Sequence, residues 1–120
     1  TLVARADANA AVIDRFVQGS GWLGHLAADP AARSNTSVCL SITDPDVAAL
    51  DLDGQAAFAK GLAAALDKEG VAYDIGHYRD APPGLRIWCG ATVETADLEA
   101  LMPWLDWAFA NQKASLKKAA

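Results

Sequence analysis

Apolar and small polar residues alternate along three short stretches of the chain, at residues 36–43, 71–75 and 85–93. Alternation with a period of two is typical of a β-strand with one buried face. The pattern therefore predicts three strands. Their predicted buried faces carry Val38, Leu40 and Ile42 in the first strand, Val71, Tyr73 and Ile75 in the second, and Leu85, Ile87, Cys89, Ala91 and Val93 in the third.

Other segments repeat apolar residues every three or four positions, which predicts helices at residues 7–18, 55–69 and 95–112. Asp7 or Asn9 is expected to cap the first helix, and Thr95 the last. Gly70 is expected to end the second helix, because glycine readily adopts the left-handed conformation found there.

Three segments depart from regular patterns. Pro103 lies inside the last helix, where it removes a hydrogen bond, so we expect a kink or break near residues 101–103. The tail at 114–120 is expected to fray. Residues 20–35 contain glycine and proline and predict an irregular connector with a short helical turn at 22–28.

The predicted order is helix, strand, helix, strand, strand, helix. Strands and helices in this proportion form an α+β two-layer sandwich. The short loop between the strands at 71–75 and 85–93 predicts that they pair antiparallel. We therefore expect a small, mainly antiparallel three-stranded sheet with helices on one face.

Composition narrows the class of protein. The chain has 120 residues, enough for one domain with its own core. The 52% of hydrophobic and 21% of charged residues exclude a disordered segment. A formal net charge of −5 disfavours a nucleic-acid partner, because phosphates repel an acidic surface. The sequence has no apolar run near the roughly 20 residues of a membrane span, so we expect no membrane partner.

The sequence has no familiar catalytic or metal-binding motif. Cys39 and Cys89 lie far apart, and we expect both to be buried and reduced, as in a cytoplasmic protein. His25 and His77 have no partners at metal-ligand spacing, so no metal site is expected. For His25, in the connector, the sequence favours local hydrogen bonding over a ligand role.

One strand carries a candidate anion site. Arg86 and Trp88 share the face of the third strand that lies opposite the predicted core. A guanidinium binds a carboxylate or phosphate through two parallel hydrogen bonds, and an adjacent indole would form a flat wall. In the alternative interpretation Arg86 is solvated or paired with a surface acid, and Trp88 only covers the sheet. The spacing alone favours the alternative.

His77 and Arg79 lie in the polar turn before this strand and are further candidates for binding an anion. Asp74 and Asp80 are close in sequence, and either of them could neutralise Arg79.

Three motifs are more specific than the alternation alone: RSNTSV at residues 33–38, PGLRIW at 83–88 and GATVE at 90–94. Together they resemble the C-terminal small domain of the phosphoserine aminotransferase family. The similarity extends over residues 2–110 and is to the branch of the family found in alphaproteobacteria and some archaea. This density of matches is more specific than a single short motif.

The resemblance implies a class V aminotransferase of the aspartate aminotransferase fold that depends on pyridoxal 5'-phosphate. Such enzymes are cytoplasmic homodimers that exchange an amino group between glutamate and 3-phosphohydroxypyruvate on the route to serine. Their large domain supplies the Schiff-base lysine and the other cofactor contacts. No cofactor-binding or catalytic residue is therefore expected in this chain, whose lysines are Lys60, Lys68, Lys113, Lys117 and Lys118.

The resemblance also implies a domain organisation. Residues 1–20 would connect to a large domain of the same polypeptide that lies outside this sequence. Residues 21–112 would form the small substrate-orienting domain, and 113–120 the tail. Alone, the 120 residues are expected neither to bind the cofactor nor to transaminate. An exposed apolar patch is expected where the large domain docks, with Trp22 and Leu23 as candidates.

In the family, an arginine on this strand binds the α-carboxylate of the substrate, and the matching residue is Arg86. A His-Arg pair ahead of it holds the substrate phosphate in the better-known bacterial branch, which points to His77 and Arg79. This chain departs from that pattern, because Tyr78 separates the two and the turn before Arg86 is longer.

Other functions remain open on the sequence. A related aminotransferase that uses glyoxylate with serine or alanine would share the carboxylate arginine but need no phosphate site. A stand-alone regulatory module that binds amino acids would fold and bind its ligand without a second domain. A plain oligomerisation domain would not need Arg86 for activity.

Overall fold

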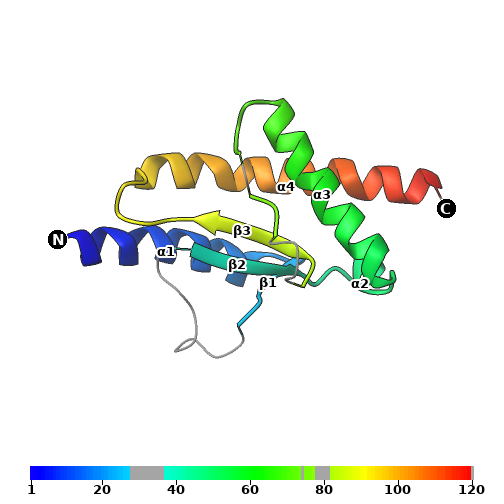
Figure 1. Cartoon of the computed structure of the whole chain (residues 1–120), viewed down its shortest axis with the longest axis horizontal. Coiled ribbons are helices and arrows are strands. Elements are labelled where there is room, and N and C mark those ends of the chain that lie inside the picture. Colours follow the sequence, from blue (N-terminus) through cyan, green and yellow to red (C-terminus); the bar gives the residue numbers. More distant parts are fainter. Residues whose placement is uncertain (28–36, 74, 78–81, 120) are drawn as a thin grey trace.

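The computed structural model describes residues 1–27, 37–73, 75–77 and 82–119 (Figure 1). In chain order the elements are α1 (Leu2–Gly19), β1 (Leu23–His25), β2 (Ser37–Ile42), α2 (Pro45–Ala48), α3 (Leu52–Lys68), β3 (Gly84–Trp88) and α4 (Thr95–Ala119). No helix in these parts of the chain combines the length and hydropathy needed to cross a membrane.

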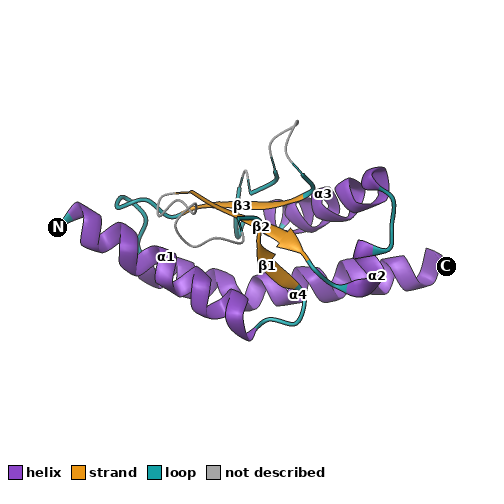
Figure 2. Ribbon diagram, turned by 90° about the horizontal axis from the view of Figure 1, so that it is seen from below, coloured by secondary structure: helices purple, strands orange, loops and turns teal. Residues whose placement is uncertain are grey.

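The strands form a single three-stranded sheet in the order β1–β2–β3, and both neighbouring pairs are antiparallel. In the pairing of β2 with β3, Leu40 lies opposite Leu85 and Val38 lies opposite Ile87. Figure 2 shows α1 and α4 on the same side of this sheet. The structure thus confirms the predicted α+β class with an antiparallel three-stranded sheet packed against helices.

The core lies between one face of the sheet and the helices. Val38 and Leu40 of β2 and Leu85 and Ile87 of β3 are almost completely buried, as the period of two predicts, whereas Ile42 at the end of β2 is half-buried. Burying each such side chain contributes about 1.5–3 kcal/mol to stability. Fully buried members of this core include Leu40, Leu85 and Ile87 from the sheet and Ile13, Leu62, Leu66 and Leu105 from the helices.

The described part of residues 71–75 does not form the predicted strand. The backbone N–H of Val71 donates to the carbonyl oxygen of Leu66 at 2.9 Å, so this segment completes the end of α3. A backbone N–H that bonds back to a helix cannot also pair with a strand, so the start of this segment does not join the sheet. At its other end, the carbonyl of Ile75 accepts from the N–H of Arg86 at 2.8 Å. One antiparallel bridge, between Gly76 and Leu85, follows this segment.

β1 replaces the helical turn that the sequence predicts at 22–28. Its pairing with β2 is extended at both ends. The N–H of Thr43 donates to the carbonyl of Trp22 at 2.8 Å, and that of Leu26 donates to the carbonyl of Cys39 at 3.0 Å. The three residues of β1 offer too few alternating positions for sequence analysis to detect.

β3 ends at Trp88, although the alternation of apolar residues predicts a strand up to residue 93. The chain turns after Trp88, and the N–H of Val93 donates to the carbonyl of Gly90 at 2.9 Å. This turn leads directly into α4.

The helices begin and end at residues that satisfy their terminal backbone groups. The first helix starts well before Asp7 and Asn9, because the hydroxyl of Thr1 accepts from the N–H of Ala4. The α3 helix covers most of the predicted segment and is followed, as expected, by Gly70, which has a φ of 71°.

α4 is one helix of 25 residues that continues through Pro103. The predicted break at 101–103 does not occur. Pro103 removes one backbone hydrogen bond, but Leu101 and Leu105 on either side of it are buried in the core. The tail, which the sequence predicts to fray, is helical as far as Ala119.

An ion-pair cluster joins the C-terminal half of α4 to α2. The ammonium of Lys113 lies 2.8 Å from both carboxylate oxygens of Asp44 and 3.1 Å from Asp46. Asp44 also caps α2 by accepting from the N–H groups of Asp46 and Val47. Burial acts to raise the pKa of Asp44, but the hydrogen bonds from Lys113 and the backbone outweigh it and lower that pKa below 3.8.

Gly84 marks the closest approach of β3 to β2. A Cβ built on Gly84 would overlap the carbonyl oxygen of Leu40, so this position has no room for a side chain. Gly76 pairs with the neighbouring Leu85, but a Cβ there would meet no atom within 4 Å.

We expect Gly84→Ala to lower the free energy of unfolding by about 1–3 kcal/mol, because the added methyl group forces the two strands apart. Urea denaturation would measure the change. Gly76→Ala is the matched control and is expected to have a much smaller effect. Equal losses in both variants would contradict the close approach at Gly84.

The lowered pKa of Asp44 makes part of the stability depend on pH. A carboxyl with a pKa lower in the folded than in the unfolded chain stabilises the fold above pH 4 and loses that contribution as the pH falls below 3.8. Asparagine keeps the cap but not the charge. The difference in unfolding free energy between the wild type and Asp44→Asn should therefore be larger at pH 6 than at pH 2.5. A difference that is constant between these pH values would refute the assignment.

Candidate functional site

The candidate site is the sheet face opposite the core, which we call the open face. It is defined by Ser37 and Cys39 of β2 and by Arg86 and Trp88 of β3. Ser37 pairs with Trp88, and Cys39 pairs with Arg86. Arg86 is half-buried, and Trp88 is 55% exposed. Arg86 and Trp88 thus share the side of the sheet that the sequence predicts, away from the helices.

The backbone that carries Arg86 is fixed on both sides. On one side it pairs with Cys39 of β2. On the other side its N–H donates to the carbonyl of Ile75 at 2.8 Å. A side chain on a strand flanked in this way starts from a rigid base, which reduces the entropy lost when it orients a ligand.

His77 is the second predicted site residue that the structure describes. It is half-buried, and its ring Nδ1 lies 3.2 Å from the carbonyl oxygen of Gly84. This contact places His77 beside β3, two positions along the strand from Arg86. Arg79, the third predicted anion-binding residue, lies outside the described residues.

Trp88 lies against the start of the turn that follows β3. A Cβ on Gly90 would come within 2.7 Å of the indole ring, so the ring packs closely over this glycine. The indole is therefore supported from one side while much of its surface faces solvent. The role of Trp88 as a wall beside Arg86 stays a prediction.

The two cysteines differ in their surroundings. Both are thiols. Cys89 is fully buried, as predicted, and burial raises its pKa to about 11. Cys39 is only half-buried, because it lies on the open face opposite Arg86 rather than in the core.

His25 makes the local hydrogen bond that the sequence predicts. Its Nε2 lies 2.9 Å from Oδ1 of Asp14 on α1, and its side chain is 9% exposed. Within the described parts of the chain, no group of three or more potential ligands could hold a metal ion.

Trp22 and Leu23, the candidates for the expected exposed apolar patch, do not form it. Both side chains are buried, with 6% and 4% of their surface exposed. Trp22 stacks on Phe109 with ring centroids 4.3 Å apart, and its Nε1 donates to Asp106 at 2.8 Å. The exposed large apolar side chains in the described residues are Leu2, Val3, Leu26, Leu52, Tyr73, Trp88, Trp104 and Trp107.

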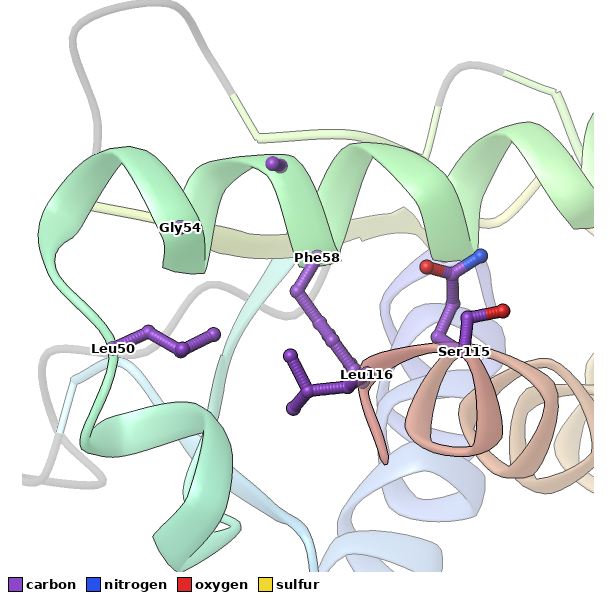
Figure 3. A pocket seen from close by; sticks show the side chains of 7 residues that line it. Leu50, Gly54, Phe58, Ser115 and Leu116 are labelled. Carbon is purple, nitrogen blue, oxygen red and sulfur yellow. The ribbon is translucent and has the colours of Figure 1, made fainter. Parts of the chain in front are cut away.

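A cavity of about 310 Å³ lies between the start of α3 and the end of α4 (Figure 3). Leu50, Phe58 and Leu116 contribute most of its apolar lining, and Gln112 and Ser115 are its polar side chains. None of its lining residues belongs to the open face, so it is separate from the candidate site.

The buried hydrogen bonds of Asn9 are not predicted by the sequence. Its side chain is completely buried, and its amide nitrogen lies 2.9–3.2 Å from the carbonyl oxygens of Cys89, Gly90 and Val93. Its amide oxygen accepts from the hydroxyl of Thr95. A polar residue on the apolar side of a helix is the sequence signal for such a site, but the sequence does not identify the partners.

Comparison with solved structures shows the class of fold to which this chain belongs. One solved phosphoserine aminotransferase, from a study of radiation damage to its Schiff base, superimposes with a TM-score of 0.66 at 15% identity, covering 90% of this chain and 27% of that one. The enzyme from Bacillus circulans subsp. alkalophilus gives a TM-score of 0.66 at 17% identity, covering 89% and 26%. The chain therefore has the fold of the C-terminal portion of these aminotransferases.

Sequence comparison finds relatives with higher identity to this chain. The chain is 47% identical over 108 residues to the phosphoserine aminotransferase of Methanosarcina barkeri and 46% identical to that of Methanosarcina mazei. Each alignment covers 90% of this chain but 26% of the relative. No family model matches the chain. The chain is homologous to part of phosphoserine aminotransferase and spans about a quarter of the length of these relatives.

Proposed function

We propose that this chain is the C-terminal, substrate-orienting part of a phosphoserine aminotransferase. The complete enzyme would exchange an amino group between glutamate and 3-phosphohydroxypyruvate in serine biosynthesis. Homology over 90% of the chain supports the family. The observation that carries the role of this part is the position of Arg86 on a rigid strand, facing away from the core beside the exposed Trp88.

The rest of the enzyme would hold the cofactor. Pyridoxal 5'-phosphate supplies an electron sink for the transferred amino group, and it binds through a lysine. The lysines whose side chains are described do not fit that task, since Lys60 and Lys68 are exposed on α3 and Lys113 is paired with Asp44. We therefore propose no catalytic step for this chain and no activity for the chain by itself.

The domain limits follow from this assignment. Residues 1–20, which include α1, would connect to the large cofactor domain of the same polypeptide. Residues 21–112 would form the small domain. Residues 113–120 would form the tail, in which the described residues 113–119 belong to α4. The complete enzyme would act as a cytoplasmic homodimer.

Arg86 would bind the α-carboxylate of the amino-acid substrate. Its guanidinium offers two parallel N–H donors that match the two oxygens of a carboxylate. Holding the carboxylate fixes the rotation of the substrate about its Cα, which determines the bond that faces the reacting group. Trp88 would limit the space on one side of the carboxylate and restrict the approach of water.

His77 and Arg79 would bind the phosphate of the substrate. The contact of His77 with the carbonyl of Gly84 supports this role, because it holds the imidazole next to the strand that carries Arg86. An enzyme that used serine or alanine with glyoxylate would need the carboxylate site but not this second anion site.

Arg86→Ala in the full-length enzyme should weaken binding of both glutamate and phosphoserine by about 1.5–3 kcal/mol, the range for a hydrogen bond to a charged group. Steady-state KM values for the two amino donors would measure the loss. Arg86→Lys should recover part of the binding, because lysine keeps the charge but not the planar pair of donors.

Arg15→Ala provides the matched control, since Arg15 is exposed on α1 and far in sequence from the open face. It should leave both KM values unchanged. If Arg86→Ala behaves like this control, Arg86 does not bind the carboxylate and the chain acts in another way, for example in oligomerisation.

Arg79→Ala should reduce the preference of the full-length enzyme for phosphoserine over serine by roughly tenfold or more, because one charged contact to the phosphate is lost. The ratio of kcat/KM for the two amino donors measures this preference. An unchanged ratio, or a wild-type enzyme that already prefers serine or alanine, would favour the glyoxylate-using alternative.

A further inference from the structure

Asn9 connects three elements that are distant in sequence. It lies in the middle of α1 and is completely buried. Its amide N–H groups reach the carbonyl oxygens of Cys89 at 3.2 Å, Gly90 at 3.1 Å and Val93 at 2.9 Å. Its amide oxygen accepts from the hydroxyl of Thr95 at 2.5 Å. One side chain of α1 is thus bonded to the end of β3, to the turn after it and to the start of α4.

The bonded carbonyl groups lie next to the candidate site. Cys89 follows directly after Trp88, and Gly90 is the residue against which the indole of Trp88 packs. At the opposite end of the strand, the close approach of Gly84 to Leu40 fixes β3 against β2. The bonds of Asn9 therefore fix the second end of the strand that carries Arg86.

Hydrogen bonds from a buried amide constrain the relative position of the bonded segments more strictly than apolar packing does. Apolar contacts tolerate small sliding movements, whereas donor and acceptor must stay aligned within a narrow range of distance and angle. Asn9 therefore constrains the segment directly after β3 through directional bonds, whereas its neighbour Val12 on α1 is a member of the apolar core.

We propose that Asn9 is a positioning residue for the substrate site. It acts through the backbone of residues 89–93 to hold Arg86 and Trp88 in place relative to α1, and this role rests on the function proposed above. Asn9 itself does not touch the substrate.

The test compares Asn9→Leu and Asn9→Ser with Val12→Ala in the full-length enzyme. Leucine has a similar volume without hydrogen bonds, and serine is too short to reach the carbonyl groups. Val12→Ala loosens the packing of the same helix but leaves the bonds intact. Two readouts apply to each variant: amide hydrogen exchange of peptides covering residues 84–93, and kcat and KM for phosphoserine.

Both Asn9 variants should increase exchange in residues 84–93 and raise KM by about tenfold with a smaller change in kcat, the equivalent of about 1.4 kcal/mol of substrate binding. Val12→Ala should leave both readouts close to the wild type. If Asn9→Leu does not fold, Asn9→Ser decides. Equal exchange and equal KM in Val12→Ala and the Asn9 variants would overturn the positioning role.

The two proposals fail in different ways. A wild-type enzyme that does not transaminate phosphoserine would overturn the proposed function and, with it, the role of Asn9 in substrate placement. Unchanged exchange at residues 84–93 in an active enzyme with Asn9 replaced would overturn the further inference alone.

Discussion

The antiparallel pairing of β2 with β3 determines which side chains face the helices and which face outward. Its register places Leu40 opposite Leu85 on the buried side and Cys39 opposite Arg86 on the open side. A shift of one residue would exchange the two faces, placing Arg86 in the core and Leu85 in solvent. The contact of Gly84 with the backbone of Leu40 resists this shift, because only a residue without a side chain fits there.

The same pairing explains how much of the fold could be predicted from the sequence. The alternation in β2 and β3 identifies both strands and their buried faces, since it reflects burial directly. The segment at 71–75 alternates as well, but the N–H of Val71 bonds to the end of α3, and a local pattern does not show that competition. β1 was missed because it exists only through its contacts with β2. The predicted break at Pro103 was wrong, since α4 continues through it while Leu101 and Leu105 on either side are buried in the core.

For the candidate site, too, the sequence predicts which face of the strand carries the residues but not the contacts around them. The position of Arg86 and Trp88 on one outward face follows from the period of a strand. Their surroundings do not, because His77 reaches Gly84 through a turn and Asn9 reaches residues about 80 positions away along the chain. Long-range polar contacts of this kind leave no periodic signal in a single sequence. Homology relates the chain to part of phosphoserine aminotransferase, and the substrate-orienting role of this part is our proposal.

The length of α4 has a consequence for how the molecule comes apart. One continuous helix of 25 residues packs against both α1 and α3, as Figure 1 also shows. Neither neighbour can detach without exposing apolar surface on α4, which is costly in water. Because α1 and α3 both pack on α4, unfolding of either one destabilises the other. We therefore expect the chain to unfold as a single cooperative unit rather than in separate halves.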